Sequence, residues 1–215
     1  MEPPPPFADR VRRILLAPRE EWPRIAAEPA SVQSIYSGWI MLLAAIGPVA
    51  LLVSTHSLRL AVAEYILWLI ITFLLAQVVD ALAPTFGGSR DFVASLKLTA
   101  YSLTVAWLAG VFNLFGVLGF APWLVAMAYT FYTLFLGASV LKRASPDRAL
   151  PFTLTVVLCA FVLGYLASVI VGGMLGRPHS GSGMHAEAAW VEPVTRSSDE
   201  DATCAPPGTS CLPRL

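Results

Sequence analysis

Residues 60–83 read LAVAEYILWLIITFLLAQVVDALA, and this stretch decides the fold class. Only two of its side chains carry a charge, those of Glu64 and Asp80. An α-helix needs about 20 predominantly apolar residues to cross a hydrocarbon core of about 30 Å. The stretch therefore predicts a transmembrane helix.

The same pattern recurs both upstream and downstream. It predicts spans over about 36–54, 60–83, 98–119, 122–141 and 152–175. Gly47-Pro48 interrupts the first, which a bundle tolerates because neighbouring helices satisfy the freed backbone groups. Of the 215 residues, 56% are hydrophobic and 13% charged, against about 25% charged in soluble domains. We predict an all-α, polytopic transmembrane helical bundle of about five spans, with 36–176 as its membrane domain.

The charges between the spans set the expected orientation, because cytoplasmic loops are enriched in Lys and Arg. Five spans would place ten basic residues on the side of the N-terminus: Arg10, Arg12, Arg13, Arg19, Arg24, Arg90, Lys97, Lys142, Arg143 and Arg148. The other side would receive four: Arg59, Arg177, Arg196 and Arg214. We therefore expect a cytoplasmic N-terminus and a C-terminus outside.

Residues 1–35 are predicted to form a cytoplasmic segment with a basic amphipathic helix. Apolar residues recur at helical spacing from Phe7 to Leu15, and Pro18 should end that helix. Such a helix could lie on an anionic leaflet or pack on loops of its own protein, and the pattern leaves both open. About 35 residues precede the first apolar run, which predicts an uncleaved first span rather than a signal peptide.

Residues 177–215 are rich in Gly, Ser, Pro and acidic residues, so we predict a disordered C-terminal tail. Cys204 and Cys211 lie in this tail, where they would form a small disulfide loop or remain free thiols.

Several functional classes find no support in the residues. The formal net charge is zero, which argues against nucleic acid as a partner. No Gly-x-Ser-x-Gly elbow, His-Glu-x-x-His motif or phosphate-binding loop occurs. We therefore expect no catalytic residue, no metal ligand and no cofactor, and the protein is not predicted to be an enzyme.

Ionisable residues inside a span suggest function by default. Glu64 and Asp80 are 16 residues apart, about 24 Å along a helix, so each should lie near one end of the second span. A transport or lipid-moving component would need a polar path, for which Asp80, Gln77 and Asn113 are the candidates.

The second span ends in a segment that we predict as an interaction loop. Pro84 should end the helix and Gly87-Gly88 should permit a turn, while Asp80 would cap a helix or pair with Arg90. The candidate residues are Asp80, Leu82, Pro84, Phe86, Gly87 and Gly88.

The fifth span carries a small residue at every fourth position. The stripe consists of Ala160, Gly164, Ser168, Gly172 and Gly176. Small residues at this spacing allow close helix approach. The pattern favours packing inside the bundle over self-association of two copies.

An ordered series of short motifs resembles the bacterial members of the Ypt/Rab-interacting protein (Yip) family. The series consists of Arg12-Arg13-Ile14-Leu15, Pro18, Glu21-Trp22-Pro23, Ile25, Glu28, Tyr36, the Asp80–Gly88 segment, Ala100-Tyr101-Ser102, Tyr129, Leu136-Gly137 and Leu141-Lys142. The resemblance implies a five-span protein of the bacterial inner membrane with a cytoplasmic N-terminus. Eukaryotic members bind prenylated small GTPases and share an Asp-Leu-x-x-Pro stretch, from which Asp80-x-Leu82-x-Pro84 departs, so that function is not transferred. We expect a non-catalytic scaffold or interaction protein, with the lipid bilayer and a membrane protein, or a second copy through the fifth span, as partners.

Overall fold

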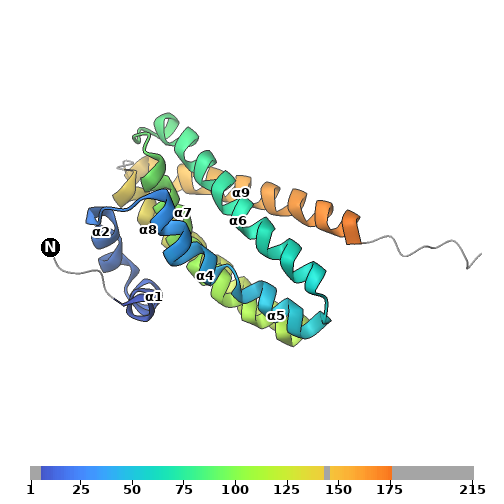
Figure 1. Ribbon diagram of the computed structural model, residues 1–215. Coiled ribbons are helices and arrows are strands. Elements are labelled where there is room, and N and C mark those ends of the chain that lie inside the picture. The colour runs from blue at the N-terminus through green and yellow to red at the C-terminus, as the bar shows by residue number, and fades with distance from the viewer. Residues whose placement is uncertain (1–5, 143–145, 176–215) are drawn as a thin grey trace, which may run out of the picture. The chain divides into compact units, whose positions relative to one another are not determined.

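The computed structural model describes residues 6–142 and 146–175, and within these ranges every regular element is a helix (Figure 1). The predicted all-α class is therefore confirmed. Four helical segments are long and apolar enough to cross a membrane, namely Val32–Thr55, Leu58–Phe86, Phe92–Leu141 and Asp147–Ala167. The chain is thus a helical membrane protein that crosses the bilayer several times.

The first apolar segment is broken near its middle. It consists of α3 (Val32–Ile35), the π-helix η1 (Tyr36–Ile40), α4 (Met41–Leu43) and α5 (Ile46–Thr55). The break falls at Ala44-Ala45, just before the predicted interruption at Gly47-Pro48. Proline has no N–H to donate four residues back, and its ring crowds that carbonyl. Pro48 therefore opens the helix at Ala44.

The second segment consists of α6 (Leu58–Leu82) and the 3₁₀ turn η2 (Ala83–Phe86). The third begins with α7 (Phe92–Ala109), several residues before the predicted start at 98. The side chain of Asp91 accepts a hydrogen bond from the backbone N–H of Ala94, which is the usual chemistry of a helix N-cap. Hydropathy missed this start because Asp91, Ser95 and Lys97 interrupt the apolar residues there.

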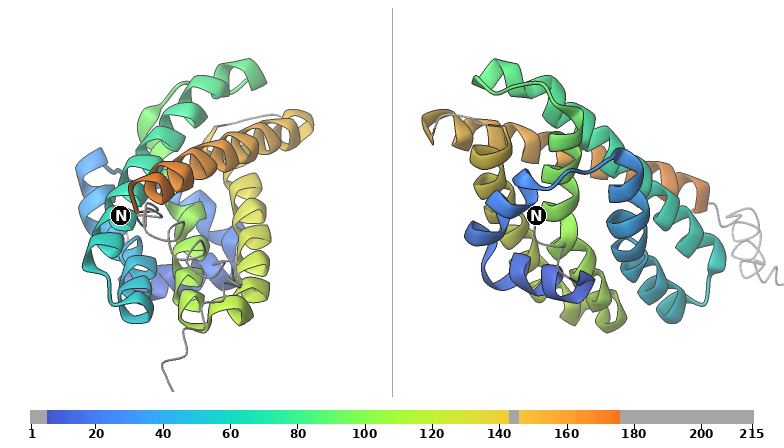
Figure 2. Two further views of the ribbon diagram at one scale, coloured as in Figure 1. Left: turned by 90° about the vertical axis from the view of Figure 1, so that its right-hand side faces the viewer. Right: turned by 60° about the vertical axis from the view of Figure 1, so that its left-hand side comes forward.

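The 50-residue segment Phe92–Leu141 turns back on itself. Its second half consists of the 3₁₀ helix η3 (Gly110–Gly119) and α8 (Phe120–Leu141). Gly116 has φ 53° and ψ −127°, outside the helical region. Leu98, early in α7, lies beside Gly137, late in α8, so the two helices run antiparallel and side by side (Figure 2). The number of membrane crossings, five, stays a prediction.

The last described helix is α9 (Pro146–Leu175), which packs against α6 and α8. The two N-terminal helices, α1 (Phe7–Leu16) and α2 (Pro18–Ala27), lie beside α7 and α8 (Figure 1). Their apolar side chains Ile14, Trp22 and Ile25 are at most 2% exposed. In the structure the apolar face of this segment packs on the helices α7 and α8 rather than on loops.

Candidate functional site

The loop between α6 and α7 is held by Lys142, the residue that directly follows α8. Oδ1 of Asp80 accepts hydrogen bonds from Lys142 Nζ at 3.1 Å, Ser95 Oγ at 3.0 Å and the Asp91 backbone N–H at 2.9 Å. Of the two alternatives for Asp80, the structure does not have the pair with Arg90: among the described residues the ion pair of Asp80 is with Lys142.

Lys142 is completely buried and binds the loop at several points. Its ammonium group also donates to the carbonyl oxygens of Ser89 at 3.3 Å and Asp91 at 2.8 Å. The main chain of Lys142 touches Gly88, where an added Cβ would stand 2.8 Å from the Lys142 carbonyl oxygen. The sequence predicts Lys142 only as a basic residue of a cytoplasmic loop. Its binding to the α6–α7 loop could not be predicted from the sequence.

The other residues of the predicted interaction loop divide into two groups. Phe86 packs edge-on against Phe152 of α9, with ring centroids 5.6 Å apart, and Leu82 is half-buried. Pro84 and Gly87 are exposed, and Gly87 has φ 79°, which glycine adopts without strain. Asp80, Leu82, Phe86 and Gly88 therefore shape the loop, while Pro84 and Gly87 remain available to a partner.

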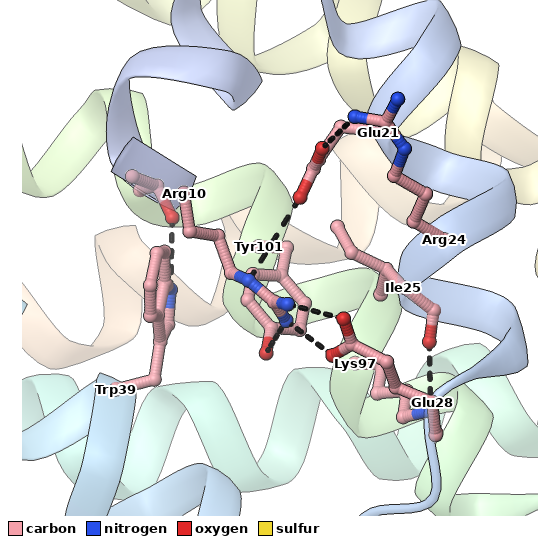
Figure 3. Close-up of polar contacts among 9 residues, drawn as sticks. Arg10, Glu21, Arg24, Ile25, Glu28, Trp39, Lys97 and Tyr101 are labelled. Atoms are coloured by element: carbon pink, nitrogen blue, oxygen red, sulfur yellow. Dashed lines mark hydrogen bonds and ion pairs between the residues drawn. The ribbon is translucent and has the colours of Figure 1, made fainter. Parts of the chain in front are cut away.

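A second polar cluster joins the N-terminal helices to the bundle (Figure 3). Arg10 of α1 is only 6% exposed and pairs with both carboxylate oxygens of Glu28, while its Nε lies 3.8 Å from Glu21 Oε1. Arg10 also donates to the hydroxyl of Tyr101 in α7 at 3.3 Å. We call these four residues, together with Lys97, the Arg10 cluster.

Lys97 of α7 completes the cluster. The charge pattern predicts Lys97 as a basic residue of a cytoplasmic loop. In the structure it is buried and donates to the carbonyl oxygens of Ile25, at 2.8 Å, and of Glu28. These carbonyls belong to the C-terminal end of α2, where the helix dipole favours a cation. Burial alone would lower the pKa of Arg10, but the hydrogen bonds with Glu28 and Tyr101 outweigh it and raise the pKa, so the guanidinium stays charged.

Helix α2 is seated on α8 through a glycine. An added Cβ at Gly137 would lie 2.5 Å from Leu98 Cδ1 and 2.7 Å from Cε2 of the Trp22 indole, so only glycine leaves room for that ring. The hydroxyl of Tyr129 also donates to the Leu15 carbonyl at 2.7 Å. Close packing and hydrogen bonds therefore hold α1 and α2 in one position.

Among the exposed charged side chains of α1 and α2, four arginines outnumber two carboxylates, those of Asp9 and Glu20. We call these four arginines the basic face: Arg12, Arg13, Arg19 and Arg24. Leu16, 72% exposed, and Phe7, 42% exposed, lie on the same two helices. The apolar side of α1 and α2 is therefore packed on the bundle. The basic face and two apolar side chains remain exposed.

The residues of the hypothetical polar path do not meet. Asp80 is engaged by Lys142 at the α6–α7 loop, and Gln77 is exposed on α6. Asn113 lies in η3, where it lines a pocket with Glu64 rather than with the other two. The transport alternative therefore loses the arrangement on which it was based.

The small-residue stripe of α9 is only partly described. Ala160 is half-buried, whereas Gly164 is exposed and an added Cβ there would meet nothing within 4 Å. Gly164 therefore makes no close contact with another helix among the described residues. Only the helical backbone of Ser168 and Gly172 is described, while Gly176, Cys204 and Cys211 lie outside the described residues.

The helices and their apolar surfaces define a multi-pass membrane protein. Comparison with known families identifies it further: the model of the Yip1 domain matches residues 12–178. The chain therefore belongs to the Yip1 domain family. No curated protein and no solved structure matches it.

The fold explains why the motifs of the sequence series occur together. Trp22 meets Gly137, and Asp80 meets Lys142, although each pair is far apart in the chain. Tyr129 bonds to Leu15. The motifs thus include the partners of the contacts that fasten α1, α2 and the α6–α7 loop to the bundle.

Proposed function

We propose that the protein is a non-catalytic scaffold of the bacterial inner membrane that presents a cytoplasmic docking surface. The surface consists of the basic face on α1 and α2 together with the exposed loop residues Pro84, Gly87 and Arg90. Its partner is the acidic cytoplasmic segment of another membrane protein, lying close to the anionic leaflet.

The Arg10 cluster carries this proposal. Burying charges is costly unless they are paired and hydrogen-bonded, so a buried guanidinium with two carboxylates is a poor way to gain stability alone. It does hold the segment in one register, because Arg10 finds its partners in only one arrangement. A basic surface in a fixed position suits specific docking, since charges at an interface contribute mainly to specificity and to the rate of association.

The chemistry of the surface favours an acidic partner. Arginine guanidinium groups bind carboxylates in a bidentate geometry, and all four of the basic face are exposed. Within the protein, Arg19 donates to the hydroxyl of Tyr132 and Arg24 pairs with Glu21. The two exposed apolar side chains, Phe7 and Leu16, add a surface that an amphipathic segment could cover.

Chemical crosslinking and pull-down from native membranes test the proposal. The variant replaces the four basic-face arginines by glutamine, and the matched control replaces Arg59, which is predicted to lie on the opposite side of the membrane. We expect the variant to lose partners that the wild type and the control retain. Recovery of the same partners from all three, or of the protein alone from wild-type membranes, would contradict the proposed docking surface.

A further inference from the structure

A pocket opens between α5, α6, α7, η3 and α8, and it shares no residue with the basic face or the Arg10 cluster. Its volume is about 290 Å³. Three tryptophans line it, Trp68, Trp107 and Trp123, together with the carboxylate of Glu64 and the amide of Asn113. An acid among indoles inside an apolar helix pair is an uncommon combination in a membrane protein.

Two polar atoms of this pocket are buried without a partner among the described residues. One is Oε2 of Glu64, and the other is Nε1 of Trp107, a residue that is 2% exposed. The second carboxylate oxygen of Glu64 accepts only a long hydrogen bond, 3.4 Å, from Nε1 of Trp68. A buried donor or acceptor without a partner costs about 1–3 kcal/mol, and more when it is charged. Both atoms are closed off from a molecule the size of water, so Glu64 and Trp107 line the pocket through their other atoms.

Glycines form the wall behind the carboxylate. At Gly110 of η3 an added Cβ would lie 2.7 Å from the Gly47 Cα, so the two backbones are in direct contact. An added Cβ at Gly47 would stand 3.5 Å from Oε1 of Glu64. The carboxylate is thus held against backbone on one side and faces the indole-lined space on the other.

From these contacts we infer that the pocket binds an organic ammonium group. A carboxylate and the faces of tryptophan rings both attract such a cation, and aromatic cages are the usual recognition device for it. The side-chain amide of Asn113 provides a further acceptor for such a group. The same group occurs in the ethanolamine headgroup of a lipid and in free small amines.

The size of the pocket agrees with this chemical class. Its volume corresponds to roughly ten water molecules at about 30 Å³ each, and it is close to the lower end, about 300 Å³, for ligand pockets. A headgroup fits such a space but a whole lipid does not. Exposed Leu114 and Phe115 of η3 offer apolar surface outside it, along which acyl chains would lie.

The inference is tested on the full chain in nanodiscs, with two arms that separate the sources. In the first arm, native mass spectrometry measures retention of phosphatidylethanolamine over phosphatidylglycerol from a mixed bilayer. In the second, ethanolamine and choline are titrated into phosphatidylglycerol nanodiscs while the thermal unfolding midpoint is recorded. Preference for the ethanolamine lipid identifies a headgroup site, whereas a raised midpoint with a free amine identifies a small-molecule site.

Three variants identify the residues responsible. Glu64→Gln keeps the shape but removes the charge, so the affinity should fall roughly 10- to 100-fold, as expected for a lost charge-assisted hydrogen bond. Trp107→Phe replaces the indole by a smaller ring that attracts a cation less strongly, and should weaken binding several-fold. Glu20→Gln, at an exposed position of α2 far along the chain from the pocket residues, is the control and should bind like the wild type.

Unfolding of each variant without added amine shows whether it is folded. An unchanged ligand-free midpoint with lost binding supports the ammonium site. Binding by Glu64→Gln equal to that of the wild type, or no lipid preference and no amine effect in the wild type, would overturn it.

Discussion

Lys142 Nζ lies 3.1 Å from Asp80 Oδ1, so a lysine that follows α8 closes the loop between α6 and α7. The same ammonium group donates to the carbonyl oxygens of Ser89 and Asp91. The conformation of this loop is therefore determined by Lys142, 51 positions beyond Asp91, together with the loop's own turn hydrogen bonds.

Replacing Lys142 by methionine should destabilise the protein. The change leaves Asp80 and two loop carbonyls without their cation, and we expect a loss of about 2–3 kcal/mol in the free energy of unfolding. Denaturation in mixed detergent micelles measures it. The control is Arg90→Gln, which alters an exposed charge of the same loop and should stay within about 0.5 kcal/mol of the wild type. Equal losses in both variants would show that the Lys142–Asp80 pair does not close the loop.

Replacing Gly137 by valine should displace α2. Its side chain would overlap the indole of Trp22, and overpacking of this kind costs about 1–3 kcal/mol. We expect faster proteolysis within residues 7–27, read by mass spectrometry, together with a lower unfolding midpoint.

The matched control for that experiment is Gly164→Ala. An added Cβ at Gly164 meets open space, and alanine favours helix over glycine by about 1 kcal/mol. This variant should be as stable as the wild type or slightly more so. Protection of residues 7–27 in the Gly137 variant equal to that in the control would contradict the proposed seating of α2.

Replacing Arg10 by methionine should be more damaging than replacing its exposed neighbour Arg12. Glu21, which is 1% exposed, and Glu28 would lose their buried cation, and breaking a buried pair from one side costs about 3–5 kcal/mol. Hydrogen exchange of the α1 and α2 amides should accelerate in Arg10→Met and stay unchanged in Arg12→Met. A double variant with Glu28→Gln should lose less than the sum of the two single losses, because the two residues interact. Strict additivity would show that the pair is not coupled.

The expected orientation places Ser89 and His56 on opposite sides of the membrane. Both are exposed, so single cysteines at these positions, in a chain whose own cysteines are replaced, should differ in labelling of intact cells. We expect Ser89→Cys to react only with a membrane-permeant maleimide and His56→Cys to react also with an impermeant one. A C-terminal alkaline phosphatase fusion should be active. The reverse labelling pattern would invert the proposed topology and move the basic face outside.

Hydropathy alone predicted the all-α class and the approximate limits of the apolar helices, because a membrane requires about 20 apolar residues wherever a helix crosses it. The same reasoning placed the start of α7 too late, since the N-cap at Asp91 and the buried Lys97 are polar. It counted Lys97 and Lys142 as loop cations because their burial depends on carbonyls and carboxylates supplied by other helices.

Only the tertiary structure showed which polar residues meet. Asp80, Gln77 and Asn113 are all polar residues in predicted apolar spans. In the structure Asp80 is paired with Lys142, Gln77 is exposed, and Asn113 lines a pocket with Glu64. The spacing of residues along one helix specifies the face on which each lies, but not the partner opposite. That partner is chosen by how helices cross, and here the crossings depend on close contacts such as Gly47 with Gly110 and Gly137 with Trp22.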